Sequence, residues 1–264
     1  MQRKLLIIGG AEDKDGGCSI LNGFLDLAGT DPRIAVVSAA SQDSEEVGFN
    51  YYDLFRDLGV GNVEVLELTC RKHAQSARSA ELIASSQGIF FTGGDQLRLT
   101  SLLCGTTVHE ALFDAMGRGA VIAGTSAGAS AMSSTMIVGG LDEVEPQRGA
   151  VSLAAGLGFL SEAVIDQHFA QRGRIGRLLM AVAQSPHLLG IGIDENTALC
   201  VENDAARILG SGAVTILDGR GLDYVNVSEL APSEPLALTD IRLHILPQGY
   251  KFDLAARRPI FNCR

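Results

Sequence analysis

Positive charge is scarce in this 264-residue chain, which has 21 Lys and Arg against 31 Asp and Glu and a net charge of -10. Nucleic acids and anionic membranes attract proteins through clusters of basic residues. The shortage therefore predicts that the chain binds neither. Long apolar runs are missing too, and the run that begins at Leu5 stops at Gly9, so we expect neither a membrane-spanning helix nor a signal peptide. Together these features predict a cytoplasmic protein.

Cysteine is also rare, and the five cysteines include no Cys-x-x-Cys pair and no Cys/His spacing typical of a metal site. An odd number of scattered cysteines argues against a disulfide framework, so we expect buried, reduced thiols. The sequence indicates no metal and no other cofactor. The cysteines are Cys18, Cys70, Cys104, Cys200 and Cys263.

Short apolar segments alternate with helical patterns along the chain, and no linker divides it. This alternation predicts one α/β domain over residues 1–264, with a mostly parallel sheet covered on both faces. Residues 45–58 have the spacing of an amphipathic helix, and the chain from Ala206 onward is rich in strands. The predicted strands are residues 5–8, 34–38, 63–68, 88–91, 121–123, 163–165 and 188–193.

A Gly-x-Ser-x-Gly turn follows the apolar residues 121–123 and opens into small residues that suit a helix. Gly124 and Gly128 permit close approach of strand and helix, while Ser126 is exposed at the turn, as a nucleophile must be. The amide of Ala127 would then face a developing oxyanion. The alternative is a glycine-rich turn that only packs tightly or binds an anion.

Two further glycine turns end predicted strands. Gly9 and Gly10 precede Glu12, whose segment lies where ligands bind in parallel sheets but lacks the spacing of a nucleotide-binding loop. The second turn, residues 92–96, is the natural source of another oxyanion donor, and Gln96 can hydrogen-bond an amide substrate. Alternatively this turn is an ordinary strand-to-helix connection capped by Asp95.

A general base and an acid are expected at the ends of two later strands. His168 follows residues 163–165 among polar neighbours, and imidazole, with an ordinary pKa of about 6.5, exchanges protons near neutral pH. Glu195 follows residues 188–193 and would orient the imidazole as the third member of a triad. Asp194 is the alternative acid.

Three arginines, Arg172, Arg174 and Arg177, form the densest cluster of positive charge. Guanidinium groups bind carboxylates in a bidentate manner, so the cluster indicates a substrate with carboxylates. Asp166 would conversely hold a cationic group, which suggests a zwitterionic substrate. The alternative for the arginines is a solvated helix face.

In order along nearly the whole chain, the segments 91–96, 124–129, 166–177 and 192–195 resemble those of cyanophycinases, serine exopeptidases related to dipeptidase E. The resemblance implies a three-layer fold similar to that of class I glutamine amidotransferases, a homodimer, and release of β-Asp-Arg dipeptides from cyanophycin. It further implies Ser126 as nucleophile, His168 as base, Glu195 as acid, and Gly94 with Ala127 as the oxyanion hole. The implied dipeptide pocket consists of Gln96, Asp166, Gln167, Arg172, Arg174 and Arg177.

Two other functions fit parts of this pattern. An aspartyl dipeptidase of the dipeptidase E type would share the serine chemistry but act on short α-linked peptides, and residues 166–177 argue against it. A non-catalytic module that binds zwitterionic peptides would keep the pocket without turnover, and the complete set of serine, histidine and glutamate argues against that.

Overall fold

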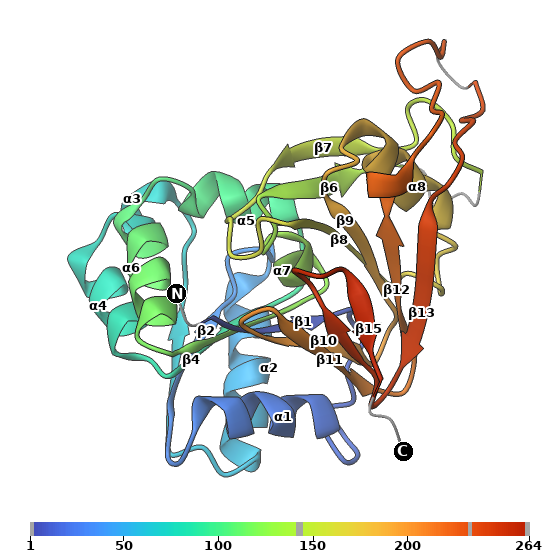
Figure 1. Cartoon of the computed structure of the whole chain (residues 1–264). Helices are drawn as coiled ribbons and strands as arrows, with labels where there is room; N and C mark the ends of the chain where they lie inside the picture. Colours follow the sequence, from blue (N-terminus) through green and yellow to red (C-terminus); the bar gives the residue numbers. More distant parts are fainter. Residues whose placement is uncertain (1–2, 141–144, 232–233, 262–264) are drawn as a thin grey trace.

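The computed structural model describes residues 3–140, 145–231 and 234–261. A nine-stranded sheet forms its centre (Figure 1), and one half of this sheet is entirely parallel. In spatial order the parallel strands are β1 (Lys4–Ile8), β5 (Val121–Thr125), β4 (Gly88–Phe91), β2 (Arg33–Val37) and β3 (Asn62–Leu66). Antiparallel strands continue the sheet beyond β1, namely β10 (Thr197–Glu202), β11 (Ala205–Gly210), β14 (Lys251–Asp253) and β15 (Arg258–Ile260).

Helices cover both faces of the parallel half because its strands are apolar on both sides. In β1, Leu6 and Ile8 pack toward α1 (Ser19–Ala28) and α2 (Ser44–Asp57). Leu5 and Ile7 belong to the apolar cluster of the other face. The helices of that face are α3 (Arg71–Ala74), α4 (Ala77–Ser85), α5 (Gln96–Leu103) and α6 (Thr107–Gly117). The predicted α/β sandwich of three layers is therefore confirmed.

A second sheet, of four strands, lies beside the antiparallel half, and α8 (Ile175–Gln184) packs on it. A short hairpin, β6 (Thr135–Gly139) and β7 (Ser152–Ala155), lies next to β8. The four strands, in spatial order, are β13 (Arg242–Pro247), β12 (Ala213–Asp218), β9 (Leu189–Ile193) and β8 (Ala163–Gln167). The predicted strand-rich C-terminal part thus contributes to both sheets.

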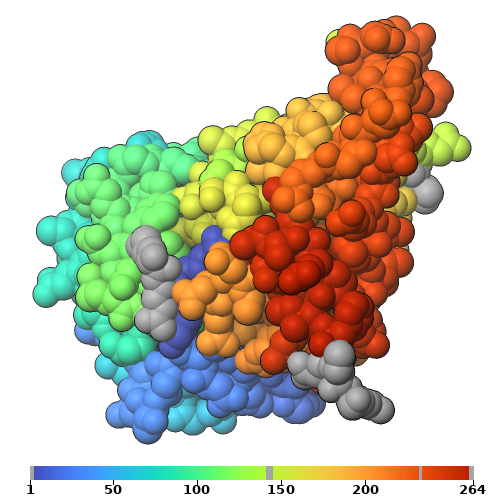
Figure 2. All heavy atoms as spheres, in the orientation of Figure 1, coloured from blue at the N-terminus to red at the C-terminus, as the bar shows by residue number. Residues whose placement is uncertain are grey.

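The connection from η1 (Gly219–Gly221) to β13 stands out from the rest of the molecule (Figure 2). Its described part bonds to the β6–β7 connection, where Arg148 N–H donates to the Glu234 carbonyl and Leu236 N–H donates to the Pro146 carbonyl. No helix within the described ranges is long and apolar enough to cross a bilayer. The four cysteines within these ranges carry free thiols, and Cys263 lies outside the described residues. Cys18 and Cys200 are buried as expected, whereas Cys70 is exposed and Cys104 is partly exposed.

The loop that follows β1 joins the two sheets. The carbonyl of Ile8 accepts a hydrogen bond from Ser126 N–H at 3.0 Å, and that of Gly9 accepts one from His168 N–H at 2.8 Å. The carbonyl of Gly10 accepts from Asn196 N–H at 2.9 Å. Three segments far apart in the sequence thereby meet at the carboxyl end of β1, where an open parallel sheet is expected to place its ligand site.

Candidate active site

The turn at Ser126 joins β5 to the four-residue helix α7 (Ala127–Ser130). Ser126 has φ 53° and ψ -111°, a conformation that is unfavourable for a residue with a side chain. Both glycines of the motif are sterically required: a Cβ on Gly124 would lie 2.6 Å from the carbonyl carbon of Gly128, and one on Gly128 would lie 2.6 Å from the Phe91 carbonyl oxygen. The local sequence therefore produces a sharp, strained turn with the serine at its tip.

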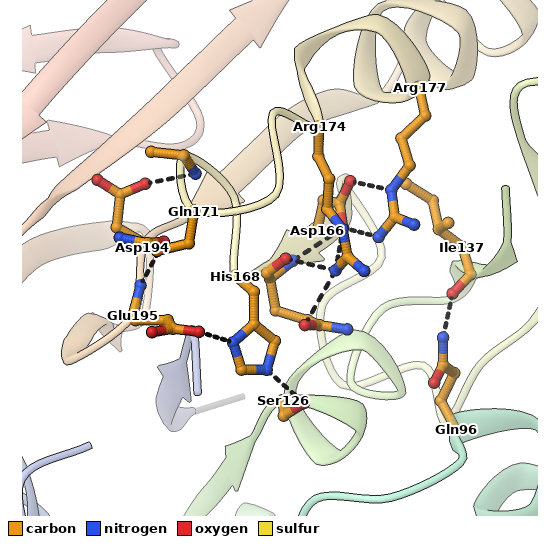
Figure 3. Close-up of polar contacts among 12 residues, drawn as sticks. Gln96, Ser126, Ile137, Asp166, His168, Gln171, Arg174, Arg177, Asp194 and Glu195 are labelled. Atoms are coloured by element: carbon orange, nitrogen blue, oxygen red, sulfur yellow. Dashed lines mark hydrogen bonds and ion pairs between the residues drawn. The ribbon is translucent and has the colours of Figure 1, made fainter. Parts of the chain in front are cut away.

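Ser126, His168 and Glu195 form a continuous chain of hydrogen bonds (Figure 3). Ser126 Oγ lies 3.0 Å from His168 Nε2, and His168 Nδ1 lies 2.6 Å from Glu195 Oε1. Such an arrangement lets the imidazole take the serine proton while the carboxylate stabilises the resulting positive charge.

His168 is held tightly by its backbone and by the β1 loop. It directly follows β8, has φ 48°, and donates its N–H to Gly9. A Cβ on Gly10 would lie only 2.3 Å from Cε1 of the imidazole, so the ring packs directly on this glycine. Position 10 must therefore lack a side chain for the histidine to reach Ser126.

Glu195, and not Asp194, is the acid that faces the imidazole. The two carboxylate oxygens of Asp194 accept hydrogen bonds from Ala170 N–H at 3.1 Å and Ala213 N–H at 3.0 Å. Asp194 therefore fixes the loop after His168 to β12, while its neighbour contacts the ring. These contacts distinguish the two carboxylates that the sequence offered for the third position of the triad.

Two backbone amides are available beside Ser126 for an oxyanion. Gly94 has φ +141°, and a Cβ there would lie 2.3 Å from the Ala40 carbonyl oxygen, so this position requires glycine. Neither Gly94 N–H nor Ala127 N–H donates to any of the described residues. Asp95 also caps α5, accepting from Leu97 N–H at 2.8 Å, so the turn has both features considered from the sequence.

A cavity of about 290 Å³ opens beside Ser126 and is lined mostly by polar groups. Gln96 Nε2 donates to the Ile137 carbonyl at 2.8 Å, which leaves the amide oxygen of Gln96 for a ligand. Arg172 is exposed and makes no ion pair with a described residue. The lining residues are Gly94, Gln96, Ser126, Val138, Gly139, Gly140, Gln167, Arg172, Arg174 and Arg177.

Asp166 differs from the expectation, because it does not line this cavity. Its side chain is fully buried, and its oxygens accept from Arg177 Nε at 2.6 Å and from Arg177 Nη2. Arg174 Nη1 lies 3.6 Å from the same carboxylate and donates to the Gln167 carbonyl at 2.6 Å. With both oxygens engaged, Asp166 is a counter-charge for the arginines and has no oxygen facing a cationic substrate group.

The arginines are consequently not a solvated helix face. Arg174 and Arg177 are almost completely buried at the start of α8, and only Arg172 is exposed. All three arginines line the cavity, and guanidinium groups are the side chains best suited to bind carboxylates. Across the described ranges, no three His, Cys, Asp or Glu side chains converge as metal ligands.

Comparison with known proteins identifies the family. The model of Peptidase family S51 matches residues 5–209. The chain belongs to peptidase family S51. The cyanophycinase of Geminocystis herdmanii (strain PCC 6308) is 40% identical over 263 residues, which cover 98% of this chain and 97% of that protein. The cyanophycinase of Synechococcus elongatus is 40% identical over 262 residues, covering 98% of this chain and 81% of that protein.

Solved structures agree with this S51 fold. The crystal structure of a peptidase from an acI-B1 Actinobacterium has a TM-score of 0.70 at 20% identity and covers 96% of this chain and 97% of that one. A putative peptidase E protein from Listeria monocytogenes EGD-e has a TM-score of 0.56 at 15% identity, over 80% of this chain and 99% of that one. At these identities the likeness concerns the fold alone.

Sequence reasoning missed some residues that hold the site of this S51 peptidase together. Gln171 Oε1 accepts a hydrogen bond from Glu195 N–H at 3.0 Å, and Asp194 ties the same loop from the other side. No sequence signal singles out Gln171, because its contact depends on two loops meeting. Glu12 was noticed only as part of an edge segment, yet it is buried beside the nucleophile turn.

Proposed function

We propose that this chain is a serine exopeptidase that hydrolyses cyanophycin to β-Asp-Arg dipeptides. The observation that carries the proposal is the hydrogen-bonded chain of Ser126, His168 and Glu195 at the wall of a cavity that three arginines line. The two relatives named as cyanophycinases, each 40% identical over nearly the whole chain, support the same substrate.

In the proposed mechanism, Ser126 Oγ attacks the peptide carbonyl carbon before a terminal β-Asp-Arg unit, and His168 Nε2 accepts the serine proton. The oxyanion of the tetrahedral intermediate accepts hydrogen bonds from the N–H groups of Gly94 and Ala127. Collapse of this intermediate breaks the C–N bond, and His168 delivers its proton to the leaving amine. Water then attacks the acyl-enzyme by the same path and restores Ser126. Glu195 holds the imidazole and stabilises its charged form throughout.

The arginines and amides of the cavity select the dipeptide unit. In cyanophycin the arginine is attached to the aspartate side chain, so each unit carries carboxylates and one guanidinium. Arg172, which is exposed on the cavity wall, is placed to bind the carboxylates, while the amide oxygen of Gln96 is an acceptor for the guanidinium. Asp166 acts through Arg174 and Arg177, and Gln167 contributes to the wall next to the base.

We further propose that the enzyme works in the cytoplasm as a homodimer. Free thiols at the described cysteines suit a reducing compartment. Large apolar side chains are exposed on the C-terminal strands, among them Leu243 and Ile245 on β13, and an exposed apolar face of this kind favours association. Light scattering of the wild type and of Ile245→Lys tests this: a dimer that becomes a monomer is expected, and a monomeric wild type contradicts it.

Mass spectrometry of the products tests the proposed substrate. The purified protein is incubated with cyanophycin and, separately, with α-linked Asp dipeptides. We expect release of β-Asp-Arg from the polymer with a kcat/KM at least about 100-fold above that for the dipeptides, equivalent to about 2.7 kcal/mol of selectivity. Efficient cleavage of the α-linked dipeptides without release from the polymer would instead establish a dipeptidase of the peptidase E type.

A further inference from the structure

Glu12 is a buried carboxylate that the proposed mechanism does not use. It follows β1 and is only 4% exposed. Its Oε2 accepts a hydrogen bond from Thr125 Oγ1 at 2.5 Å, and its Oε1 accepts one from the hydroxyl of Tyr51 on α2. Lys14 Nζ lies 3.7 Å from Oε1 and 4.4 Å from the centre of the Tyr51 ring. The buried charge is therefore compensated by two hydroxyl donors and one cation.

These contacts converge on the nucleophile turn. Thr125 is the last residue of β5 and directly precedes Ser126. The last residue of β1 and the first two residues of the loop that carries Glu12 accept hydrogen bonds through their carbonyls from the N–H groups of Ser126, His168 and Asn196. Glu12 thus lies next to backbone carbonyls that bond to Ser126, to His168 and to Asn196, the neighbour of Glu195.

The turn needs such support because its backbone is strained. At φ 53° and ψ -111°, Ser126 persists only if neighbouring contacts hold it there. A hydroxyl that donates to a buried carboxylate forms a strong, charge-assisted bond. Burial, and then the charge of Glu12, raise the pKa of Tyr51 well above its ordinary value, so Tyr51 also remains a donor to this carboxylate.

We propose that Glu12 is a positioning residue for the nucleophile. Its carboxylate fixes the Thr125 hydroxyl and thereby keeps Ser126 Oγ within hydrogen-bond distance of His168. This inference rests on the proposed serine mechanism. The proposal predicts that loss of the Thr125 hydroxyl and loss of the Tyr51 hydroxyl, both of which donate to Glu12, change catalysis to different extents. Only Thr125 is joined to the nucleophile, whereas Tyr51 anchors the carboxylate to α2.

The matched pair Thr125→Val and Tyr51→Phe tests this difference, because each variant removes one hydroxyl from the same carboxylate. We expect Thr125→Val to lower kcat on cyanophycin about 10- to 100-fold with KM within about twofold, the range typical of a misplaced reacting group. Labelling of Ser126 by a serine-directed phosphonate should slow by a similar factor. Tyr51→Phe should lower the melting temperature yet keep kcat and labelling within about twofold. Thr125→Ser, which retains the hydroxyl, should restore most of the rate.

Equal losses of kcat in Thr125→Val and Tyr51→Phe would overturn the proposal, as would an unchanged labelling rate in Thr125→Val. If Thr125→Val does not fold, Glu12→Gln decides: it must slow labelling more than Tyr51→Phe does, and equality overturns the proposal. The labelling assay is independent of the substrate. A wild type that labels but does not degrade cyanophycin refutes the proposed substrate alone, whereas a wild type that does not label refutes the serine mechanism and with it the role of Glu12.

Discussion

Two neighbouring regions of the site meet at the end of β8 and are built in opposite ways. On the catalytic side, His168 and Glu195 remain partly exposed, with 13% and 36% of their side chains accessible. On the charged side, Asp166 is fully buried and the side chains of Arg174 and Arg177 are 5% and 6% exposed. Groups that exchange protons with a substrate must be reachable, whereas charges that shape a cavity are best held by saturated, buried pairs.

Removal of the base should have the largest effect and separates the two regions most clearly. We expect His168→Ala to lower kcat at least about 1,000-fold, because no other group then takes the Ser126 proton. Binding of β-Asp-Arg, measured by calorimetry, should change less than about threefold. His187→Ala, which alters an exposed histidine away from the cavity, is the control. A His168→Ala protein that keeps a tenth of the wild-type kcat would contradict this role.

Loss of the buried ion pair between Asp166 and Arg177, on the charged side, should lower the stability of the fold. Asp166→Asn removes a buried carboxylate that contacts both Arg174 and Arg177, so we expect the free energy of unfolding to fall by about 3–5 kcal/mol. Urea denaturation monitored by circular dichroism measures this change. The double variant Asp166→Asn, Arg177→Met should recover part of the loss, because one buried cation is removed as well. A single variant as stable as the wild type would show that the pair does not hold this region.

Arg172 is exposed on the cavity wall, so its removal should affect binding without affecting stability. We expect Arg172→Gln to raise KM for cyanophycin about tenfold, a loss of about 1.4 kcal/mol that is typical of one charge-assisted contact, with kcat within about twofold. Steady-state kinetics beside Arg118→Gln, which alters an exposed arginine that bonds Ala84, provide the measurement. A fall in kcat at constant KM would contradict a binding role for Arg172 and indicate a catalytic one.

Gln171 should give the smallest effect because it acts on the catalytic side through one backbone hydrogen bond. We expect Gln171→Ala to loosen Glu195 and lower kcat about 2- to 10-fold, in proportion to one hydrogen bond of about 0.5–1.5 kcal/mol. KM and the melting temperature should stay close to those of the wild type, as they should in the control Gln184→Ala at the end of α8. An unchanged kcat in Gln171→Ala would show that Asp194 alone holds this loop.

Much of the catalytic side follows from the sequence because its signals are local. The glycines of the Gly-x-Ser-x-Gly turn mark a sharp strand-to-helix turn, and the apolar segments before His168 and Glu195 place both residues at strand ends. The strand predicted at 34–38 and the helix predicted at 45–58 match β2 and α2 within two residues at either end. The small residues after Ser126 predicted a helix, and α7 occupies Ala127–Ser130 before the chain enters β6.

The charged side could not be predicted because its contacts join residues across the fold. Asp166, Gln167 and His168 are adjacent in the sequence but have separate partners, since the strand ends at Gln167 and His168 adopts a positive φ. Whether Asp166 faces substrate or an arginine depends on where α8 begins and on its packing against β9 and β12. Residue types alone suggested a zwitterionic pocket, whereas the fold neutralises Asp166 internally.

Identification of the reactive nucleophile tests the central claim most directly. The wild type and Ser126→Ala are each treated with a serine-directed phosphonate, mapped by peptide mass spectrometry, and assayed for release of β-Asp-Arg from cyanophycin. We expect one adduct on the wild-type peptide that contains Ser126, no adduct on the variant, and loss of turnover in a folded Ser126→Ala protein. Continued release of β-Asp-Arg by that variant would contradict the serine mechanism and the roles assigned to His168 and Glu195.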